Sequence, residues 1–187
     1  MNSLLKLGVG SALLALAGMS NATLLDGKTL NIQYFVPDLS SLVPTVYSGN
    51  LVVGPGVELV DPARTNFDAS VDFSDTQITV MYHYTDTDYS GSFVGARVND
   101  VLGQINPFTS FTINPSTTAL GFNQSRLSFD SDNLFINFAG FSYTAGTQLV
   151  LDITATAPVP EPETHALMLL GLGAVGWAAR RRNGARR

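Results

Sequence analysis

The residues best suited to chemistry lie in one short polar segment of the chain, positions 86–91. Oxygen-bearing side chains alternate along it at Asp86, Asp88 and Ser90, and Gly91 follows. This matches the opening half of a calcium-binding loop, in which alternating oxygens converge on the ion and a glycine allows a sharp turn. The bidentate glutamate that normally completes such a loop is replaced by an arginine. The pattern therefore predicts a weak Ca²⁺ site.

A polar hairpin turn is the alternative interpretation of the same segment. The segment lies between two predicted strands, 77–84 and 92–98, and Asp, Ser and Gly are favoured in turns for reasons unrelated to metals. A second segment of this kind, 130–133, reads Asp-Ser-Asp-Asn. We interpret it as a turn alone.

Paired carboxylates are the other arrangement that could carry a reaction. One carboxyl acting as an acid and another as a base or nucleophile can hydrolyse a glycosidic bond. Glu58 is the single glutamate between residues 23 and 157, and only a fold can show which aspartates pair. His83 lies within a strand-like run and is interpreted as a strand histidine, so no catalytic residue is assigned. Four aromatic residues are candidates for a sugar-stacking face: Tyr82, Tyr84, Tyr89 and Phe93.

The charge balance and the absence of cysteine limit what the chain can bind. Residues 23–157 hold four basic residues against thirteen acidic ones, a formal net charge of −9. Nucleic acid is excluded as a partner because its affinity depends on Lys and Arg neutralising phosphates, whereas cations suit such a domain. The chain has no cysteine, which excludes disulfides and Cys-ligated metals.

A succession of short strands must position these side chains. Runs enriched in Val, Ile, Phe, Tyr and Thr alternate apolar with polar positions, as half-buried strands do. Turn-forming residues such as Gly54-Pro55-Gly56 separate the runs. This pattern predicts an all-β fold, an antiparallel β-sandwich of jelly-roll-like type. The candidate strands are 30–36, 46–53, 56–60, 69–73, 77–84, 92–98, 110–113, 125–129, 134–138 and 148–154.

Residues 1–22 have the pattern of a secretion signal. A lysine precedes the apolar stretch 7–19, and Ser20 and Ala22 are the small residues that signal peptidase recognises. The pattern predicts export through the Sec machinery and cleavage by signal peptidase between Ala22 and Thr23.

The last thirty residues contain three parts in a fixed order. Pro160-Glu161-Pro162 comes first, an uncharged apolar run from Ala166 to Ala179 follows, and the run ends in a stop-transfer cluster, Arg180, Arg181 and Arg182. The run can enter a bilayer as a transmembrane helix, with the arginines left in the cytoplasm. Fourteen helical residues cover only about 21 Å of a hydrocarbon core of about 30 Å, so we expect a temporary anchor.

This order of motifs resembles the PEP-CTERM sorting domain. The resemblance covers residues 158–187 and implies that exosortase, a membrane transpeptidase-like enzyme, recognises the tail and cleaves near Pro160, Glu161 and Pro162. It also implies a Gram-negative source and a final location at the cell surface, in the outer membrane or outside the cell, after an intermediate anchored in the inner membrane.

We therefore expect a signal peptide (1–22), a β-sandwich domain (23–157) and a PEP-CTERM sorting tail (158–187). The expected function is that of a non-enzymatic cell-surface or matrix protein associated with the exopolysaccharide of a biofilm. The alternative is a secreted glycoside hydrolase or lyase that acts on polysaccharide through paired carboxylates. An enzyme needs a concave cleft with converging carboxylates, whereas a structural module should have a filled core.

Overall fold

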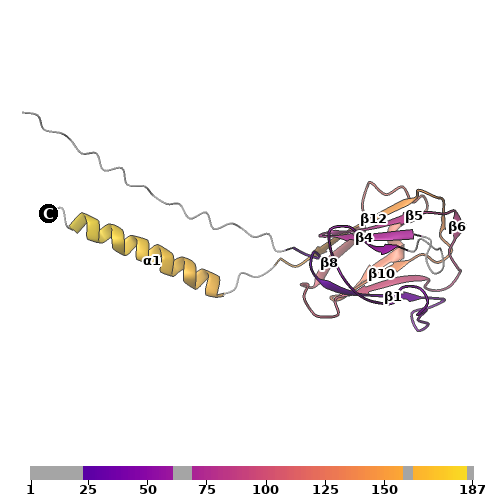
Figure 1. The fold of residues 1–187 in the computed structure, drawn as a ribbon, viewed down its shortest axis with the longest axis horizontal. Coiled ribbons are helices and arrows are strands. Elements are labelled where there is room, and N and C mark those ends of the chain that lie inside the picture. The colour runs from indigo at the N-terminus through magenta and orange to yellow at the C-terminus, as the bar shows by residue number, and fades with distance from the viewer. Residues whose placement is uncertain (1–22, 61–68, 158–161, 185–187) are drawn as a thin grey trace, which may run out of the picture.

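The computed structural model describes residues 23–60, 69–157 and 162–184. Between residues 23 and 157, ten strands form two five-stranded antiparallel sheets (Figure 1). The predicted signal peptide, residues 1–22, lies outside the described residues.

The first sheet, sheet A, has the strand order β2-β1-β7-β10-β9. Neighbouring strands pair antiparallel throughout. Its strands are β1 Thr29–Phe35, β2 Gly49–Val52, β7 Gly95–Asn99, β9 Leu127–Phe129 and β10 Asn133–Asn137.

The second sheet, sheet B, has the strand order β3-β4-β5-β12-β8, again antiparallel. Its strands are β3 Val57–Val60, β4 Ala69–Ser74, β5 Gln77–Tyr82, β8 Phe108–Ile113 and β12 Gln148–Ala155. A short 3-10 helix, Gln124–Arg126, leads into β9. A separate two-stranded ribbon pairs β6 Asp86–Thr87 with β11 Ser142–Tyr143.

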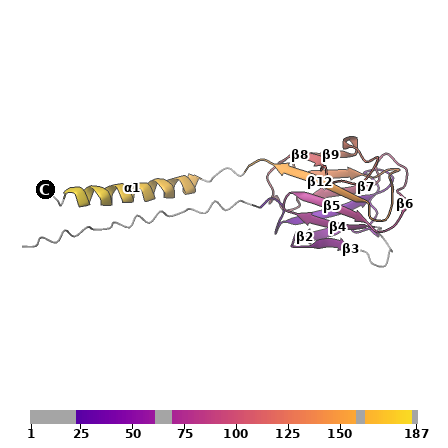
Figure 2. The same ribbon diagram turned by 90° about the horizontal axis from the view of Figure 1, so that it is seen from above.

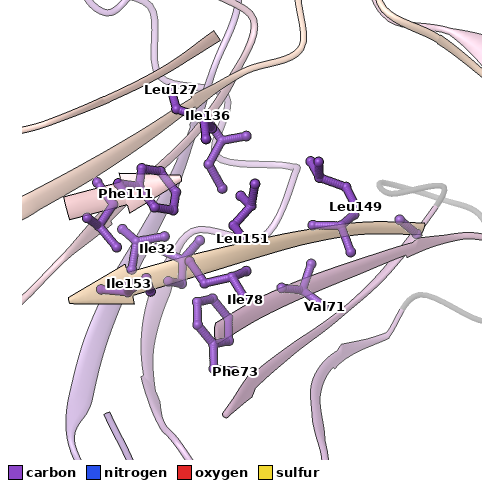
Figure 3. Close-up of a cluster of buried hydrophobic side chains, with 14 of the residues drawn as sticks. Ile32, Val71, Phe73, Ile78, Phe111, Leu127, Ile136, Leu149, Leu151 and Ile153 are labelled. Carbon is purple, nitrogen blue, oxygen red and sulfur yellow. The ribbon is translucent and has the colours of Figure 1, made fainter. Parts of the chain in front are cut away.

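Alternation along the strands explains why the sheets pack face to face. In β5 the side chains of Ile78, Val80 and Tyr82 are buried, and the residues between them are only partly covered. The same period of two appears in β4 and β10, as expected for strands with one face on a core. Side chains from both sheets join one hydrophobic cluster, part of which is shown in Figure 3. The two layers are visible in Figure 1, and Figure 2 shows the strands from above.

The observed topology confirms the prediction of an antiparallel all-β fold and refines it. Strands β3, β4 and β5 form a simple meander at one side of sheet B. A jelly roll is built from two Greek keys instead, so the likeness to one extends only to the two-sheet architecture.

The predicted hairpin between residues 77–84 and 92–98 is wrong. Strand β5 belongs to sheet B and β7 to sheet A, so the chain between them crosses from one sheet to the other. On the way it forms β6, which pairs with β11 rather than with either flanking strand. Crossovers and hairpin turns use the same polar residue types, and local composition therefore did not distinguish them.

The predicted turn at residues 130–133 is confirmed and joins β9 to β10. The Asp130 carboxylate accepts hydrogen bonds from the backbone N–H groups of Asp132 (2.9 Å) and Asn133 (2.8 Å). The amide from Asp132 is the chief reason that the pKa of Asp130 lies below its ordinary value of 3.8. The acidic residues of this segment therefore have a structural role.

The start of the domain is fastened to the β4–β5 turn. The Asp75 carboxylate accepts hydrogen bonds from the backbone N–H groups of Leu24 and Leu25. The Leu25 N–H also bonds the Asp75 carbonyl oxygen at 3.1 Å, and the Leu25 side chain is fully buried. Leu24 and Leu25, which directly follow the predicted cleavage point, are thus part of the folded domain.

The C-terminal segment forms one helix, α1 Pro162–Gly184. It contains the whole apolar run from Ala166 to Ala179 that was predicted to be helical. Within the part of the chain that the structure describes, no helix has the length and apolarity needed to cross a membrane.

Candidate functional site

The two sheets enclose a hollow at one side of the sandwich, beneath β4 and β5. Its volume is about 750 Å³, within the range of about 300–1,000 Å³ typical of ligand pockets. Sheet B contributes inward-facing residues such as Val71, Phe73 and Val80, and sheet A contributes Ile32 and Val98 from β1 and β7. Because side chains alternate along these strands, the parts of the wall that they form are apolar.

The polar residues of the hollow gather at one end, which we call the mouth. Strand β5 runs from the fastened β4–β5 turn toward Tyr82, and β6 follows shortly after it. Asp86, Thr87 and Asp88 line the mouth together with four tyrosines, Tyr34, Tyr47, Tyr89 and Tyr143. Figures 1 and 2 both show β6 at one end of the sandwich.

The β6–β11 ribbon positions the two carboxylates. Asp86 lies opposite Tyr143 in the register, and the Thr87 and Ser142 hydroxyls lie 2.8 Å apart. One step further, the Asp88 backbone N–H donates to the Phe141 carbonyl oxygen at 2.9 Å. Residues two apart on a strand lie on the same face, which explains why Asp86 and Asp88 both line the mouth.

Tyr34 and Asp88 make the contact that joins the two sides of the mouth. The Tyr34 hydroxyl donates to the Asp88 carboxylate over 3.5 Å, across 54 residues of sequence. Burial raises the pKa of Tyr34 far above its ordinary value of 10, and the negative charge of Asp88 adds to the effect. Tyr34 therefore stays protonated and remains a donor across the physiological range.

A cluster of aromatic rings supports the mouth from below. The Tyr82 and Tyr143 rings stack with their centroids 3.9 Å apart, and Phe138 meets Tyr82 edge-on at 6.5 Å. Burial, followed by the charge of Asp88, raises the pKa of Tyr82 as well. The rings fix the position of β11, and through it the position of β6.

Arg126 closes this cluster from the opposite side. Its guanidinium lies 5.8 Å from the Phe141 ring centroid and donates to the carbonyl oxygens of Asn137 (3.2 Å) and Ala139 (3.0 Å). Through these contacts Arg126 stabilises the position of the 137–141 segment. No Lys, Arg or His is among the described residues that line the hollow.

The predicted calcium ligands are only partly brought together. Asp86 and Asp88 line the mouth, whereas Ser90 is exposed and not part of the lining. Gly91 has a different role from the one expected, because a Cβ there would lie 2.4 Å from the Pro37 carbonyl oxygen. Among the described residues, no group of three or more His, Cys, Asp or Glu side chains could hold a metal ion. The calcium site stays a prediction.

Most other carboxylates in the domain have structural partners. Glu58 accepts from the backbone N–H groups of Gly54 (2.9 Å) and Phe73 (2.7 Å). Asp152 accepts from the side-chain amides of Gln77 and Asn114. His83 is exposed, with its Nε2 atom 3.0 Å from the Ser70 hydroxyl. These contacts match the places of Glu58, Asp152 and His83 in and beside strands.

The predicted sugar-stacking aromatics do not form one face. Tyr82 and Phe93 are buried, and Phe93 packs edge-on against Phe35 with centroids 6.4 Å apart. Tyr89 is 76% exposed beside the mouth. Sequence reasoning missed Tyr34 and Tyr143, because their partners are far away along the chain.

The tail keeps its apolar residues uncovered. Seven large apolar side chains of α1 are 61–70% exposed: Leu167, Met168, Leu169, Leu170, Leu172, Val175 and Trp177. Near the end of the helix, the Arg181 guanidinium lies 4.1 Å from the Trp177 ring centroid. Pro160 and Glu161 of the sorting motif lie outside the described residues, and Pro162 begins the helix.

Comparison with known families identifies the tail. Residues 158–182 match the PEP-CTERM protein-sorting motif. The chain carries a PEP-CTERM sorting motif. This motif marks it as an exported protein that is processed at the membrane, with exosortase as its processing partner. No curated protein and no solved structure matches this chain.

Proposed function

We propose that this protein is displayed at the cell surface or in the extracellular matrix, where its β domain associates with exopolysaccharide in a biofilm without catalysing a reaction. The observation that carries the proposal is the sorting motif at residues 158–182, which directs the chain to exosortase. The structural hydrogen bonds of Glu58 and Asp152 support a non-enzymatic role, since these carboxylates are used to hold the fold.

The tail acts as a temporary membrane anchor in this proposal. The exposed leucines of α1 supply an apolar surface for the bilayer, and Arg180 and Arg181 are exposed at its C-terminal end. Basic residues stay on the cytoplasmic side of a bacterial membrane. The short apolar run gives a weak anchor, which suits a protein that is later released by cleavage.

The sorting step is tested by replacing Pro160, Glu161 and Pro162 together with alanine. The variant should stay in the membrane fraction with its tail attached, while the parent loses the tail and leaves that fraction. A matched control changes Pro107 and Pro115, which lie in loops of the β domain, and should be processed like the parent. Equal release of the motif variant and the parent would contradict the proposal.

A polysaccharide-acting enzyme is the second candidate, and the hollow with Asp86 and Asp88 at its mouth is the observation that favours it. A glycoside hydrolase or lyase needs a concave site with carboxylates in it. The test is incubation of the exported protein with the polysaccharide of its own cells, followed by measurement of new reducing ends or unsaturated sugar ends. Product formation that is lost in Asp88→Asn would replace the non-enzymatic proposal.

A further inference from the structure

We propose that the outer face of sheet A binds an uncharged polysaccharide, whose hydroxyl groups exchange hydrogen bonds with a row of asparagine amides that crosses the sheet. This inference rests on the proposed association with exopolysaccharide, and it names the surface and the sugar chemistry responsible. The strand register, the side-chain hydrogen bonds and one partly exposed aromatic ring support it.

Asparagines occupy matching register positions on four neighbouring strands of sheet A, and we call them the amide row. Each is paired with the next in the register, in the order Asn50 of β2, Asn31 of β1, Asn99 of β7 and Asn133 of β10. Neighbouring strands lie about 4.8 Å apart, so the row spans roughly 14 Å of the sheet. A row of this length can contact more than one unit of an extended sugar chain.

The amide row lies on the outer face of the sheet, away from the core. Leu30, next to Asn31, and Val98, next to Asn99, are buried. Since side chains alternate between the two faces of a strand, the asparagines face outward. Asn50 is exposed, and the other three members of the row are partly exposed. The amides are therefore accessible to a ligand.

Hydrogen bonds between the amides hold them in fixed orientations. The Asn31 Nδ2 atom donates to Asn50 Oδ1 at 2.7 Å. The Asn99 Nδ2 atom donates to Asn133 Oδ1 at 2.9 Å, and Asn133 Nδ2 donates to the Asp130 carboxylate at 2.9 Å. An amide has two N–H donors and an oxygen with two lone pairs, so these bonds leave part of its capacity for a ligand. A sugar hydroxyl, which both donates and accepts, matches such a surface.

Strand stability does not explain the amide row. Asparagine is depleted in β-strands, where Thr, Val and Ile fit the pleated surface better. Four asparagines at matching positions of one sheet therefore point to a role in binding.

An aromatic ring and an arginine lie beside the amide row. Phe135, two residues after Asn133 on β10, is partly exposed and lies opposite Arg97 in the register. The Phe135 ring meets Phe93 edge-on with centroids 6.4 Å apart, and the Arg97 Nη2 atom donates to Gln33 Oε1. The C–H face of a sugar ring is apolar and packs on an aromatic ring, while guanidinium N–H groups donate to hydroxyl oxygens.

The charge of the domain favours an uncharged polysaccharide over an acidic one. The formal net charge of −9 over residues 23–157 repels a polyanion. The Asp130 carboxylate adds a negative charge at the end of the amide row. Neutral amides and sugar hydroxyls exchange hydrogen bonds without needing opposite charges.

The experiment uses the exported full-length protein and the exopolysaccharide of its own cells, separated by anion exchange into an uncharged and an acidic fraction. Affinity electrophoresis in gels that contain one fraction or the other measures how far the protein is retarded. The uncharged fraction should retard it, with an apparent Kd that does not change with ionic strength, since salt screens only interactions between charges. Equal or stronger retardation by the acidic fraction would overturn the proposal.

Variants test whether the amide row is the binding surface. Asn31→Val combined with Asn99→Val removes two neighbouring amides and should weaken binding at least about tenfold. Valine is favoured in strands, so this variant should fold. Thr79→Val combined with Thr112→Val makes matched changes on the outer face of sheet B and should bind like the parent. Circular dichroism checks that each variant is folded.

Phe135→Leu provides a second variant should the asparagine pair fail to fold. It keeps an apolar side chain, loses the ring and should weaken binding roughly threefold. Retardation that both variants leave unchanged would overturn the proposed surface alone, because the protein would then bind polysaccharide elsewhere. Retardation by neither fraction would overturn this inference together with the proposed association with exopolysaccharide.

Discussion

The two halves of the sandwich interior differ in how well they are filled. Beneath β8 and β12, the side chains of Phe111, Leu149, Leu151 and Ile153 are almost fully buried and do not border the hollow. Beneath β4 and β5, smaller side chains such as Val71 face the hollow. Both halves have the same alternation along their strands, so alternation alone does not decide whether the space between the sheets is filled.

The largest difference should appear when a core side chain is shortened in each half. Leu151→Ala should lower the free energy of unfolding by about 2–5 kcal/mol, because it opens a new cavity in close-packed surroundings. Val80→Ala should cost about 1 kcal/mol, since this side chain already borders the hollow and loses fewer contacts. Urea unfolding of both variants measures the two values, and equal losses would mean that the halves are packed alike.

Enlarging a side chain should have the reverse pattern. Ile153→Phe in the filled half should cost about 1–3 kcal/mol through overpacking. Val80→Phe in the hollow half should change stability by less than about 1 kcal/mol, because the ring extends into open space. The measurement is again the urea midpoint, and a Val80→Phe penalty as large as that of Ile153→Phe would argue against the hollow.

Calcium binding would distinguish the two halves further, because Asp86 and Asp88 lie at the mouth of the hollow half. If Asp86, Asp88 and Ser90 hold Ca²⁺ with a Kd of about 10⁻⁴–10⁻³ M, ten times that concentration should stabilise the protein by about 1.4 kcal/mol. The melting temperature should then rise by a few degrees. Melting curves in calcium, magnesium and chelator provide the measurement.

The control for the calcium series is Asp86→Ala combined with Asp88→Ala, which should lose the calcium-dependent rise. An equal rise in the parent and in the double variant would leave the segment with no calcium-binding role.

The smallest expected effects concern two carboxylates with opposite pKa shifts. Burial, and then the charge of Glu58, raises the pKa of Asp72 on the outer face of β4, so its ionised form destabilises the folded state above that pKa. Asp72→Asn should therefore raise stability slightly near pH 7, since solvent screens the charge of this side chain, and the gain should vanish as the pH falls to 3. Hydrogen bonds lower the pKa of Asp130, so its stabilising contribution is present at neutral pH and is lost as the pH falls below about 3.8.

Urea unfolding between pH 7 and pH 3 compares both sites directly. Asp130→Ala should be less stable than the parent at pH 7, and the two should converge at low pH. A constant offset across the pH range would show that neither charge is linked to folding.

Much of the fold could be predicted from sequence because strand alternation is a local property. The alternating apolar residues Ile78, Val80 and Tyr82 predict which face of the strand is buried. The residue types around Asp130 likewise predict a turn. The crossing of the chain between β5 and β7 was not, since a turn and a crossover share a composition. The hollow could not be predicted either, because it depends on which side chains of the two sheets lie opposite one another.

In the candidate site, too, contacts between residues far apart in the chain could not be predicted from sequence. Asp86 and Asp88 were recognised from their spacing, but Tyr34 was not, although its hydroxyl contacts Asp88. Fifty-four residues separate the two in the chain. Pairings of that kind come from the arrangement of the sheets, and a single sequence contains no periodic signal for them.

The hydrogen bonds from the Leu24 and Leu25 amides to the Asp75 carboxylate bear on when the chain can be cleaved before Thr23. A protease needs several residues on each side of its target bond laid out in extended form, and the amides of Leu24 and Leu25 are held by Asp75 once the domain has folded. If the chain is cleaved between Ala22 and Thr23 as the sequence predicts, cleavage and the formation of these hydrogen bonds compete in time. We then expect cleavage to come first, while the emerging chain is still unfolded, and a precursor that folds early to be cleaved poorly.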